Sequence, residues 1–265
     1  MDIKPNQHAF ITGGASGIGL GIAQALADKG VCVTIADIDD NALTNLPTAL
    51  PHPHFAIKLD VRNPQQWHNC KVAAENKFGP VDILINNAGI SFDGEALADI
   101  NPDSVNQVLS INLMGIYHGL SCFAADMRAR QQGHIVNTAS VMGLLQGVAG
   151  MGIYSASKAA VVALSEALRS EMAPYNVGVS VLCPGLVTSN LRENTVKLGG
   201  VVKNATRKNN AQKTAMPARE AGDIVVFGIM ENVPYLLTHP EHLDNMQRRV
   251  DAVRDSVDTV LHRNQ

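Results

Sequence analysis

The sequence places a tyrosine and a lysine four residues apart, in the stretch Tyr154-Ser-Ala-Ser-Lys158. On a helix, residues at this spacing share one face, so the Lys158 ammonium would lie beside the Tyr154 phenol. A positive charge at roughly 5 Å favours the phenolate by about 3 kcal/mol at an effective dielectric constant of about 20, or on the order of two pKa units. We therefore expect the pKa of Tyr154 to fall towards neutral, which suits a group that gives and takes a proton.

Ser140 precedes this pair, at the end of the β-branched run HIVNTA. From there its hydroxyl could donate a hydrogen bond to a substrate oxygen and stabilise the negative charge that develops on it. Taken alone, each feature has a plainer interpretation: a serine that caps a strand end, and a solvent-exposed Tyr/Lys pair. A cofactor held beside them would turn the set into a site that moves a hydride and a proton together.

A glycine-rich turn near the amino end, TGGASGIG at residues 12–19, could hold such a cofactor. Glycines such as Gly13, Gly17 and Gly19 let the backbone approach a pyrophosphate, whose charge the amides of the following helix would bind. The spacing Gly-x3-Gly-x-Gly differs from the GxGxxG of other dinucleotide folds. A bare glycine turn is weak evidence, but this one lies between the first strand and the first helix, which favours the cofactor.

Asp37 follows at the end of the second strand. A carboxylate there can accept hydrogen bonds from the ribose hydroxyls of an adenosine, and it repels a 2′-phosphate. Neither Ser16 nor Ile38 supplies the cation that a phosphorylated ribose would need, so NAD is favoured over NADP. The alternative is that Asp37 only caps a turn, with Asp39 beside it.

Short β-branched runs alternate with longer amphipathic or alanine-rich stretches, which is the pattern of repeated βα units. The expected strands cover residues 8–12, 31–36, 54–59, 81–86, 134–139 and 177–183. The expected helices cover residues 17–29, 64–77, 102–129 and 155–173. This order predicts a single-domain α/β Rossmann fold: a doubly wound parallel sheet of about seven strands with helices on both faces.

Two helix starts are marked by proline at the first helical position, Pro64 and Pro102, with Asn63 and Asn101 as N-caps. All 265 residues are expected to form one NAD-binding domain, because α/β domains of about 250 residues commonly stay undivided. Within it, residues 188–217 lose periodicity and are expected to form an excursion that covers the substrate. Residues 240–262 are expected to form a helical tail.

With these elements, the chain resembles the short-chain dehydrogenase/reductase family. The resemblance covers residues 9–188, some two thirds of the chain. It rests on four motifs that occur in the family's order: TGGASGIG, Asn86-Asn87-Ala88-Gly89, Ser140 with Tyr154-x3-Lys158, and Pro184-Gly185.

The resemblance implies a role for each matching residue. Asp60 and Val61 would contact the adenine, and the residues after Pro184 would contact the nicotinamide side. The implied catalytic residues are Asn112, Ser140, Tyr154 and Lys158, with Asn112 supporting a water-linked proton path to the lysine. The implied cofactor-binding residues are Gly13, Ser16, Gly17, Ile18, Gly19, Asp37, Asp60, Val61, Asn87, Ala88, Gly89, Tyr154, Lys158, Pro184, Gly185, Val187 and Thr188.

Residues and resemblance together predict an NAD-dependent oxidoreductase that interconverts a secondary alcohol and a ketone, with Tyr154 as general acid and base. One alternative is an NADPH-dependent ketone reductase, which Asp37 opposes. Another is a non-catalytic dinucleotide-binding sensor, which would not need an intact Ser/Tyr/Lys set. The resemblance also implies a homodimer or homotetramer that pairs through the helix at 102–129 and the helix after Tyr154.

Two features depart from the family's pattern. The interval from Ser140 to Tyr154 is one residue longer than in most members, so the loop through Gln146 could reshape the mouth of the substrate site. The glycine-rich acidic ending of many relatives is replaced by Pro234-Tyr-Leu-Leu-Thr238 and a charged tail, which leaves the usual subunit contacts around that strand open.

Two groups of side chains bear on the substrate. The loop after Ser140 is apolar, which fits an alcohol with an apolar or aromatic body or, equally, ordinary loop packing: Met142, Leu144, Leu145, Val148 and Met151. The excursion is basic, which could attract an anionic substrate or simply be solvated: Arg192, Lys197, Lys203, Arg207, Lys208 and Lys213.

The composition limits the partners. The net charge is −3, and no concentrated basic face invites nucleic acid or an anionic membrane, so small molecules are the expected partners. No uninterrupted apolar run approaches roughly 18 residues, and the amino end leads straight into the first strand, which leaves no room for a signal peptide. The four cysteines form no CxxC pair, so we expect reduced thiols, no bound metal and a cytoplasmic location.

Overall fold

The computed structural model describes residues 1–46, 50, 53–145, 147–202 and 215–264. Its centre is a seven-stranded parallel sheet in the order β3-β2-β1-β4-β5-β6-β7. The predicted α/β fold with one doubly wound sheet is confirmed. The strands are β1 His8–Thr12, β2 Cys32–Asp37, β3 His54–Lys58, β4 Ile83–Asn86, β5 Gly133–Thr138, β6 Val177–Cys183 and β7 Tyr235–Leu237.

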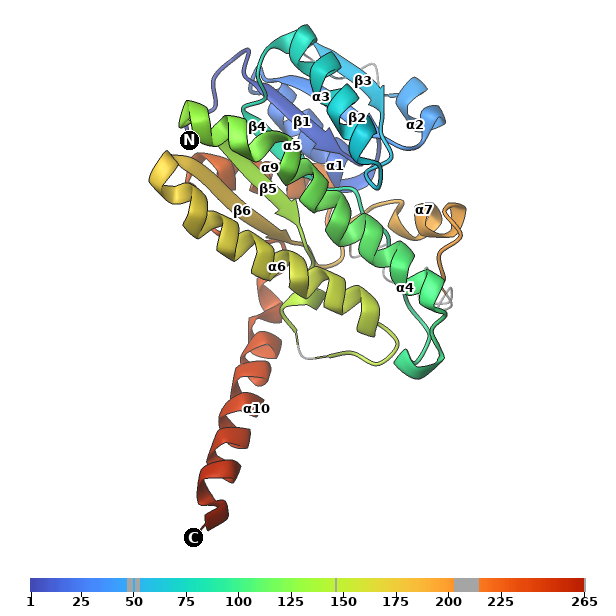
Figure 1. Ribbon diagram of the computed structural model, residues 1–265, viewed down its shortest axis with the longest axis vertical. Coiled ribbons are helices and arrows are strands. Elements are labelled where there is room, and N and C mark those ends of the chain that lie inside the picture. The colour runs from blue at the N-terminus through green and yellow to red at the C-terminus, as the bar shows by residue number, and fades with distance from the viewer. Residues whose placement is uncertain (47–49, 51–52, 146, 203–214, 265) are drawn as a thin grey trace.

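Helices cover both faces of this sheet (Figure 1). The α-helices are α1 Gly17–Ala27, α2 Asp40–Thr44, α3 Pro64–Phe78, α4 Pro102–Leu109, α5 Gly115–Arg130, α6 Gly152–Met172, α7 Leu191–Lys197, α9 Ala218–Met230 and α10 Leu243–Leu261. Short helices are η1 Leu97–Asp99, η2 Ser110–Met114, η3 Val141–Gly143, η4 Ala173–Tyr175, η6 Pro240–His242 and η7 His262–Asn264.

Two apolar cores hold the layers together, one on each face of the sheet. On the face covered by α3, α5 and α6, the Phe10 ring packs against Trp67 at 5.8 Å and against Phe123 at 5.1 Å between ring centroids. On the other face, α1 and α9 cross with their backbones in contact, since a Cβ on Gly21 would lie 2.1 Å from the Ala218 carbonyl oxygen. Only glycine permits that approach.

Both predicted helix caps are confirmed. Asn63 accepts hydrogen bonds from the amides of the first turn of α3, and Asn101 does the same for α4. The helix expected at 102–129 differs, because its α-helical hydrogen bonds are interrupted by one π-helical segment, η2, between α4 and α5. A π segment carries an extra residue per turn and is common at functional sites, and here it contains Asn112.

Among the described residues, one helical stretch, Pro102–Arg130, is long and apolar enough to cross a membrane by length and composition. Of the 18 most apolar consecutive residues in this stretch, 44% are buried, where α5 packs on β4 and β5. Packing against the sheet accounts for its buried apolar side chains, whereas Met114 and Tyr117 are exposed.

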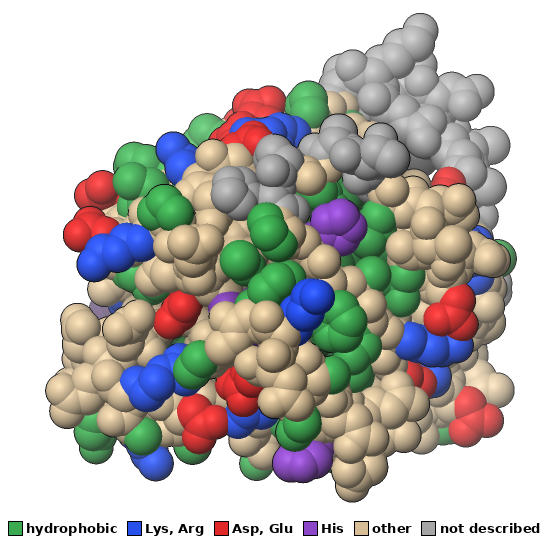
Figure 2. All heavy atoms as spheres, turned by 90° about the horizontal axis from the view of Figure 1, so that it is seen from above, with side chains coloured by type: hydrophobic (Ala, Val, Ile, Leu, Met, Phe, Trp, Pro, Cys, Tyr) green, Lys and Arg blue, Asp and Glu red, His purple; other side chains and the backbone are tan. Residues whose placement is uncertain are grey.

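On the face seen in Figure 2, acidic and basic side chains are interspersed with apolar ones over the described part of the molecule. The last long helix, α10, differs from the rest of the fold because it extends away from the body (Figure 1).

Candidate active site

The sheet order changes direction between β1 and β4. From β1 the chain proceeds outwards through β2 and β3, and from β4 it proceeds the other way through β5, β6 and β7. In such sheets the connections leave on opposite sides, and a crevice opens beyond the carboxyl ends of the strands. A cavity of about 320 Å³ lies there, lined by residues that follow β1, β2, β3, β4, β5 and β6. This volume falls in the usual range of small-molecule sites.

The glycine-rich turn forms part of the wall of this cavity. Gly13 and Gly17 have φ values of 60° and 51°, a left-handed conformation that favours glycine. A Cβ on Gly19 would lie 2.2 Å from the Gly13 carbonyl oxygen, so α1 begins directly against the turn. Ser16 is the N-cap of α1 and makes no side-chain capping bond. The first amides of α1 are therefore available to an anionic group at this helix start.

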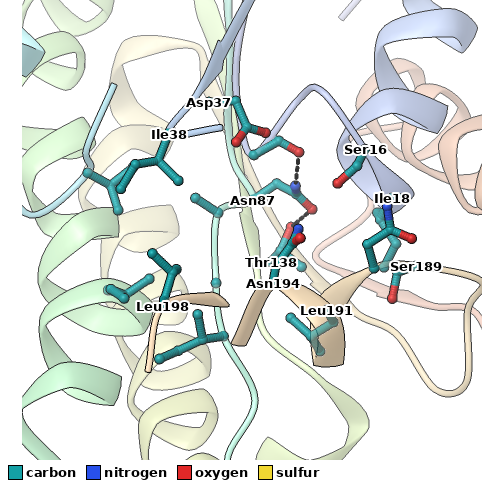
Figure 3. A pocket seen from close by; sticks show the side chains of 18 of the residues that line it. Ser16, Ile18, Asp37, Ile38, Asn87, Thr138, Ser189, Leu191, Asn194 and Leu198 are labelled. Carbon is teal, nitrogen blue, oxygen red and sulfur yellow. Dashed lines mark hydrogen bonds between the residues drawn. The ribbon is translucent and has the colours of Figure 1, made fainter. Parts of the chain in front are cut away.

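Asp37 ends β2 and faces the same cavity (Figure 3). Its carboxylate accepts hydrogen bonds from the Ala15 and Asp39 amides, both at 3.1 Å, and burial raises its pKa. These two bonds fix the carboxylate, and each oxygen keeps a free lone pair for a further donor. The geometry agrees with the turn-capping alternative and with a ribose-binding acid, because one carboxylate can do both.

A polar link ties the turn after β1 to the turn after β4. The Thr12 hydroxyl accepts hydrogen bonds from the Asn87 amide at 2.9 Å and the Ala88 amide at 3.1 Å. The Asn87 side chain donates back to the Thr12 carbonyl at 3.0 Å. Its oxygen accepts from the Thr138 hydroxyl at 3.4 Å, a bond that Figure 3 shows. The three strand ends are thus held in register around the cavity.

Tyr154 and Lys158 lie on one face of α6, as the four-residue spacing predicts, and both line the cavity. The Lys158 ammonium is 5.9 Å from the centroid of the Tyr154 ring and donates to the Thr138 carbonyl at 2.9 Å. The Tyr154 hydroxyl is hydrogen-bonded to Ser140. All three side chains are buried.

The expected direction of the Tyr154 pKa shift is wrong for the chain by itself. Burial raises the pKa of this phenol, and the hydrogen bond with Ser140 opposes that rise without cancelling it. Burial also lowers the pKa of Lys158 to about 8, so the neighbouring ammonium is itself pushed towards its neutral form. The spacing of the two residues reveals the attraction between their charges, but it does not reveal the free-energy cost of removing both groups from water.

Asn112 lies in the π segment and is fully buried beside Lys158. Its amide group bonds both main-chain groups of Ile90: the oxygen accepts at 2.8 Å and the nitrogen donates at 2.9 Å. A Cβ on Gly89 would lie 3.2 Å from the Asn112 oxygen and 3.4 Å from the Lys158 nitrogen, so Gly89 separates the two side chains. Asn112 therefore positions the loop after β4 against the lysine.

Most of the expected site residues meet in this cavity. Those that line it are Gly13, Ser16, Gly17, Ile18, Asp37, Asp60, Val61, Asn87, Ala88, Gly89, Tyr154, Lys158 and Pro184. Those outside its wall are Gly19, Asn112, Ser140, Gly185, Val187 and Thr188. The Gly185 amide donates to Thr238, and Thr188 bonds the Met216 carbonyl, so these residues face the chain that follows α7 and β7.

The cavity wall also contains residues that were not predicted to bind the cofactor or to take part in catalysis: Ile38, Asp39, Leu59, Arg62, Ile90, Ile111, Thr138, Ala139, Ser189, Asn190, Leu191, Asn194, Lys197 and Leu198. Of these, Lys197 was predicted only as one of the basic residues that could attract an anionic substrate. Thr138 could have been found, because it precedes Ser140 by two residues at a strand end and so shares its face. The uncharged residues of α7 in the wall, Leu191 and Asn194, gave no signal, since a helix of seven residues has too little periodicity to stand out from a polar segment.

Helix α7 forms one side of the cavity, and Leu191 and Leu198 lie across it from Asp37 (Figure 3). Of the basic residues expected in the excursion, Arg192 pairs with the buried Asp93 at 2.8 Å and Lys197 pairs with Asp39 at 3.1 Å. The remaining four fall outside the described residues: Lys203, Arg207, Lys208 and Lys213.

The apolar loop after Ser140 divides into two groups. Met142, Leu144 and Met151 pack against the large core, which favours ordinary packing for these three. Val148 is 45% exposed. Gln146, where the longer interval from Ser140 to Tyr154 falls, lies outside the described residues.

Among residues 1–46, 50, 53–145, 147–202 and 215–264, no three His, Cys, Asp or Glu side chains gather as metal ligands would. The polar groups that line the cavity are instead amides, hydroxyls, the carboxylates of Asp37, Asp39 and Asp60, the ammonium groups of Lys158 and Lys197, and the Arg62 guanidinium. This donor set fits a phosphate-linked dinucleotide, with glycines where its pyrophosphate needs space and a carboxylate where a ribose would lie.

Comparison with known proteins gives a consistent result. A family model described as short chain dehydrogenase matches residues 7–200. The chain is 38% identical over 183 residues to a galactitol 2-dehydrogenase of Agrobacterium fabrum, covering 69% of this chain and 71% of that one. It is 29% identical to a C alpha-dehydrogenase of a Sphingobium species, over 95% of this chain and 87% of that one.

A solved structure shares the whole architecture. A short-chain dehydrogenase/reductase from Burkholderia phymatum, in complex with NAD, superposes with a TM-score of 0.88 and 30% sequence identity. The superposition covers 97% of each chain.

Proposed function

Because this chain belongs to the short-chain dehydrogenase family, we propose that it is an NAD-dependent oxidoreductase that interconverts a secondary alcohol and a ketone. Family membership supports an oxidoreductase that binds a nicotinamide dinucleotide and acts on a small molecule. The choice of NAD and of a secondary alcohol comes from this chain's own residues. The relatives named galactitol 2-dehydrogenase and C alpha-dehydrogenase agree with an alcohol substrate.

One observation carries the proposal: the Tyr154 hydroxyl meets Ser140 and lies above a buried lysine at one end of a cavity whose other end is a glycine turn at a helix start. In that place Tyr154 transfers the proton to or from the substrate oxygen. Ser140 donates to the same oxygen and stabilises its developing charge. The bound nicotinamide ring would supply the hydride acceptor or donor.

Lys158 and Asn112 support the tyrosine. The ammonium favours the phenolate, and it offers donors for a ribose hydroxyl, since among the described residues its hydrogen-bond acceptor is the Thr138 carbonyl. Asn112 holds Ile90 and Gly89 against the lysine, which positions the start of the proton path that water would continue. Both side chains act through the phenol, and neither needs to touch the substrate.

Asp37 supports NAD over NADP. Its carboxylate is fixed by two backbone amides and lines the cavity, where it would accept from ribose hydroxyls and repel a 2′-phosphate. Asp39 also lines the cavity, and its charge is paired with Lys197 at 3.1 Å, so the preference for NAD rests on Asp37. The proposal accordingly ranks the NADPH-dependent reductase below the NAD-dependent enzyme.

The proposal also covers the domain organisation, the cellular location and the assembly of the enzyme. One domain carries both the cofactor and the substrate, with the segment around α7 as its cover. The cysteines are free, the state that a reducing cytoplasm favours. Surfaces on α5 and α6 pair copies into a homodimer or homotetramer.

The test combines binding with turnover. Isothermal titration calorimetry should give tighter binding of NAD than of NADP, and a panel of cyclic, aromatic and sugar-derived secondary alcohols should include a substrate that produces NADH absorbance. Tyr154→Phe should keep the NAD affinity and lose turnover by about 100-fold or more, the usual contribution of general acid and base groups. A protein that binds NAD, and whose turnover survives this substitution, would contradict the proposed mechanism.

A further inference from the structure

Helix α10, Leu243–Leu261, is the one α-helix of more than ten residues in the described chain in which no side chain is buried. It leaves the body after η6 and extends away from it (Figure 1). Its 19 residues give a length of roughly 28 Å at about 1.5 Å per residue. An isolated helix of this length is only marginally stable in water, so a covering partner would contribute to its stability.

The apolar side chains on one face of α10 form a stripe, here called the α10 seam: Leu243, Met246, Val250, Val253, Val257 and Val260. All of them are exposed except Met246, which is half-buried. The intervals between them alternate between three and four residues, which is the heptad pattern that keeps one face of a helix against another helix. Val253 is 62% exposed and Val260 is 64% exposed, so within the part of the chain that the structure describes nothing covers this end of the seam. The end of the seam is continuous with Leu261, which is 68% exposed.

We propose that the α10 seam is an interface with a second copy of this chain, in which two α10 helices pack antiparallel as a short two-helix coiled coil. This contact is separate from the surfaces of α5 and α6, and it does not depend on the activity proposed above.

The charge of the helix selects a protein partner rather than a lipid surface. Helix α10 carries three arginines and four aspartates. Helices that lie on anionic membranes have an excess of lysine and arginine on the polar face, and this helix has none. Its near-neutral polar face, with an internal pair between Arg254 and Asp251 at 3.6 Å, does not repel an identical helix.

The positions that flank the seam select the antiparallel orientation. In a parallel pair, Arg249 would face Arg254 of the second copy, which places like charges together at both edges. In an antiparallel pair centred between Val250 and Val253, Arg249 instead lies near Ser256, and Arg254 lies near Gln247. This arrangement has two-fold symmetry and closes on itself, as a dimer interface requires.

The helix is also held at a fixed angle to the body near its start. The Arg249 guanidinium donates to the Gly143 carbonyl at 3.4 Å, in the η3 turn that follows Ser140. The seam therefore begins on an anchored segment and continues beyond the body, where a second helix can reach both of its sides.

Molar mass in solution tests the interface. Light scattering after size-exclusion chromatography should show that Val253→Glu with Val257→Glu halves the mass of the assembly at micromolar concentration, because two charges would be buried in the seam. The matched control, Arg248→Glu with Thr259→Glu, adds the same residue type on the opposite face and should leave the mass unchanged. An unchanged thermal unfolding midpoint of the body shows that the seam variant is folded. A seam variant with the wild-type mass would overturn the proposal.

Disulfide trapping tests the orientation. When chains carrying Val250→Cys are mixed with chains carrying Val253→Cys and oxidised, the antiparallel pair predicts crosslinks mainly between unlike chains. Crosslinks mainly between like chains would overturn the antiparallel arrangement. A membrane partner would give a different result with vesicles of phosphatidylcholine and phosphatidylglycerol. If the wild-type protein floats with the vesicles, the seam variant does not, and the two proteins have equal molar mass, the seam binds a membrane and the proposed dimer interface is overturned.

Discussion

The two ends of the cavity are built by different means. At the adenosine end, Asp37 and Asn87 are fixed by hydrogen bonds to backbone groups, and the glycine turn supplies free amides. At the reaction end, Tyr154 and Lys158 are buried side chains whose ionised forms burial disfavours, since the pKa of the phenol is raised and the pKa of the ammonium is lowered to about 8.

This difference separates recognition from chemistry. Groups that recognise a constant feature of a ligand can be fixed in place before it arrives, because their charge does not change during binding. Groups that transfer a proton must be able to exist in both protonation states, and here burial disfavours the charged form of each. The adenosine end should therefore tolerate substitutions with losses in affinity, whereas the reaction end should lose turnover and gain stability.

Lys158→Met gives the sharpest contrast between the two ends. Removing the ammonium takes away the charge that favours the phenolate, worth about 3 kcal/mol, so kcat should fall by about 100-fold or more. The exposed Lys77→Met serves as the control and should leave kcat unchanged. Steady-state kinetics with any substrate found in the alcohol panel measures the effect. A loss of less than about fivefold would mean that the lysine does not assist the phenol.

The same variant should be more stable than the wild type. The folded-state pKa of Lys158 is about 8, below its ordinary value of 10.5, so the unfolded chain binds more protons between these pH values and stability rises with pH through that window. At pH 7 the buried charge costs about 3 kcal/mol, and the lost bond to Thr138 offsets about 1 kcal/mol of the gain. The midpoint of thermal unfolding should rise by about 4 to 8 °C. A lower midpoint would show that the ammonium is well paired in the fold.

Asp37→Ser probes the adenosine end. A hydrogen bond to a charged group contributes about 1.5 to 3 kcal/mol, so NAD affinity should fall by about 10- to 100-fold while NADP affinity falls less. The control Asp40→Ser removes a carboxylate that lies nearby in α2, does not line the cavity and pairs with Lys58. Calorimetric dissociation constants for both nucleotides measure the ratio. If the ratio stays unchanged, Asp37 is only the cap of its turn.

Six of the seven strands could be predicted from the sequence to within one or two residues, because continuous β-branched runs between helical stretches have few alternatives. No range was predicted for the seventh strand, β7, which has only three residues. The run at 177–183 coincides with β6. The π segment that carries Asn112 could not be predicted, since its reason is a tertiary one: the side chain satisfies both main-chain groups of Ile90, a residue that is distant in sequence. Local periodicity contains no trace of that contact.

The candidate site likewise has features that the sequence predicted and features that depend on tertiary contacts. Motif spacing predicted which side chains would be neighbours, and Tyr154, Lys158 and Asp37 do line one cavity. The direction of the Tyr154 pKa shift was wrong because it depends on burial, which spacing does not reveal. Leu198 in the wall was missed for a related reason: it reaches the cavity only through the placement of α7, which no motif marks.

His134 tests whether burial alone, without function, produces such shifts. It lies in β5 with its Nε2 bonded to Ser180, and burial lowers its pKa to about 3. The unfolded chain therefore binds an extra proton between about pH 6.5 and 3, and stability is lost as the pH falls through 6.5, by about 2 kcal/mol at pH 5. His134→Gln should reduce the stability difference between pH 7 and pH 5 by that amount in urea titrations. The exposed His68→Gln should not.

The smallest effect on cofactor binding is expected from the exposed ion pair between Lys197 and Asp39 at the adenosine end of the cavity. Lys197 of α7 is 66% exposed and pairs with Asp39 at 3.1 Å, and this contact lowers the pKa of Asp39. Exposed pairs contribute about 0 to 1 kcal/mol and are screened by salt, so Lys197→Ala should change the KM for NAD by less than about fivefold at low salt. The change should disappear in about 1 M salt. A change of more than about tenfold that persists in salt would mean that Lys197 binds the cofactor directly, and the adenosine end would then depend on a lysine ammonium as the reaction end does.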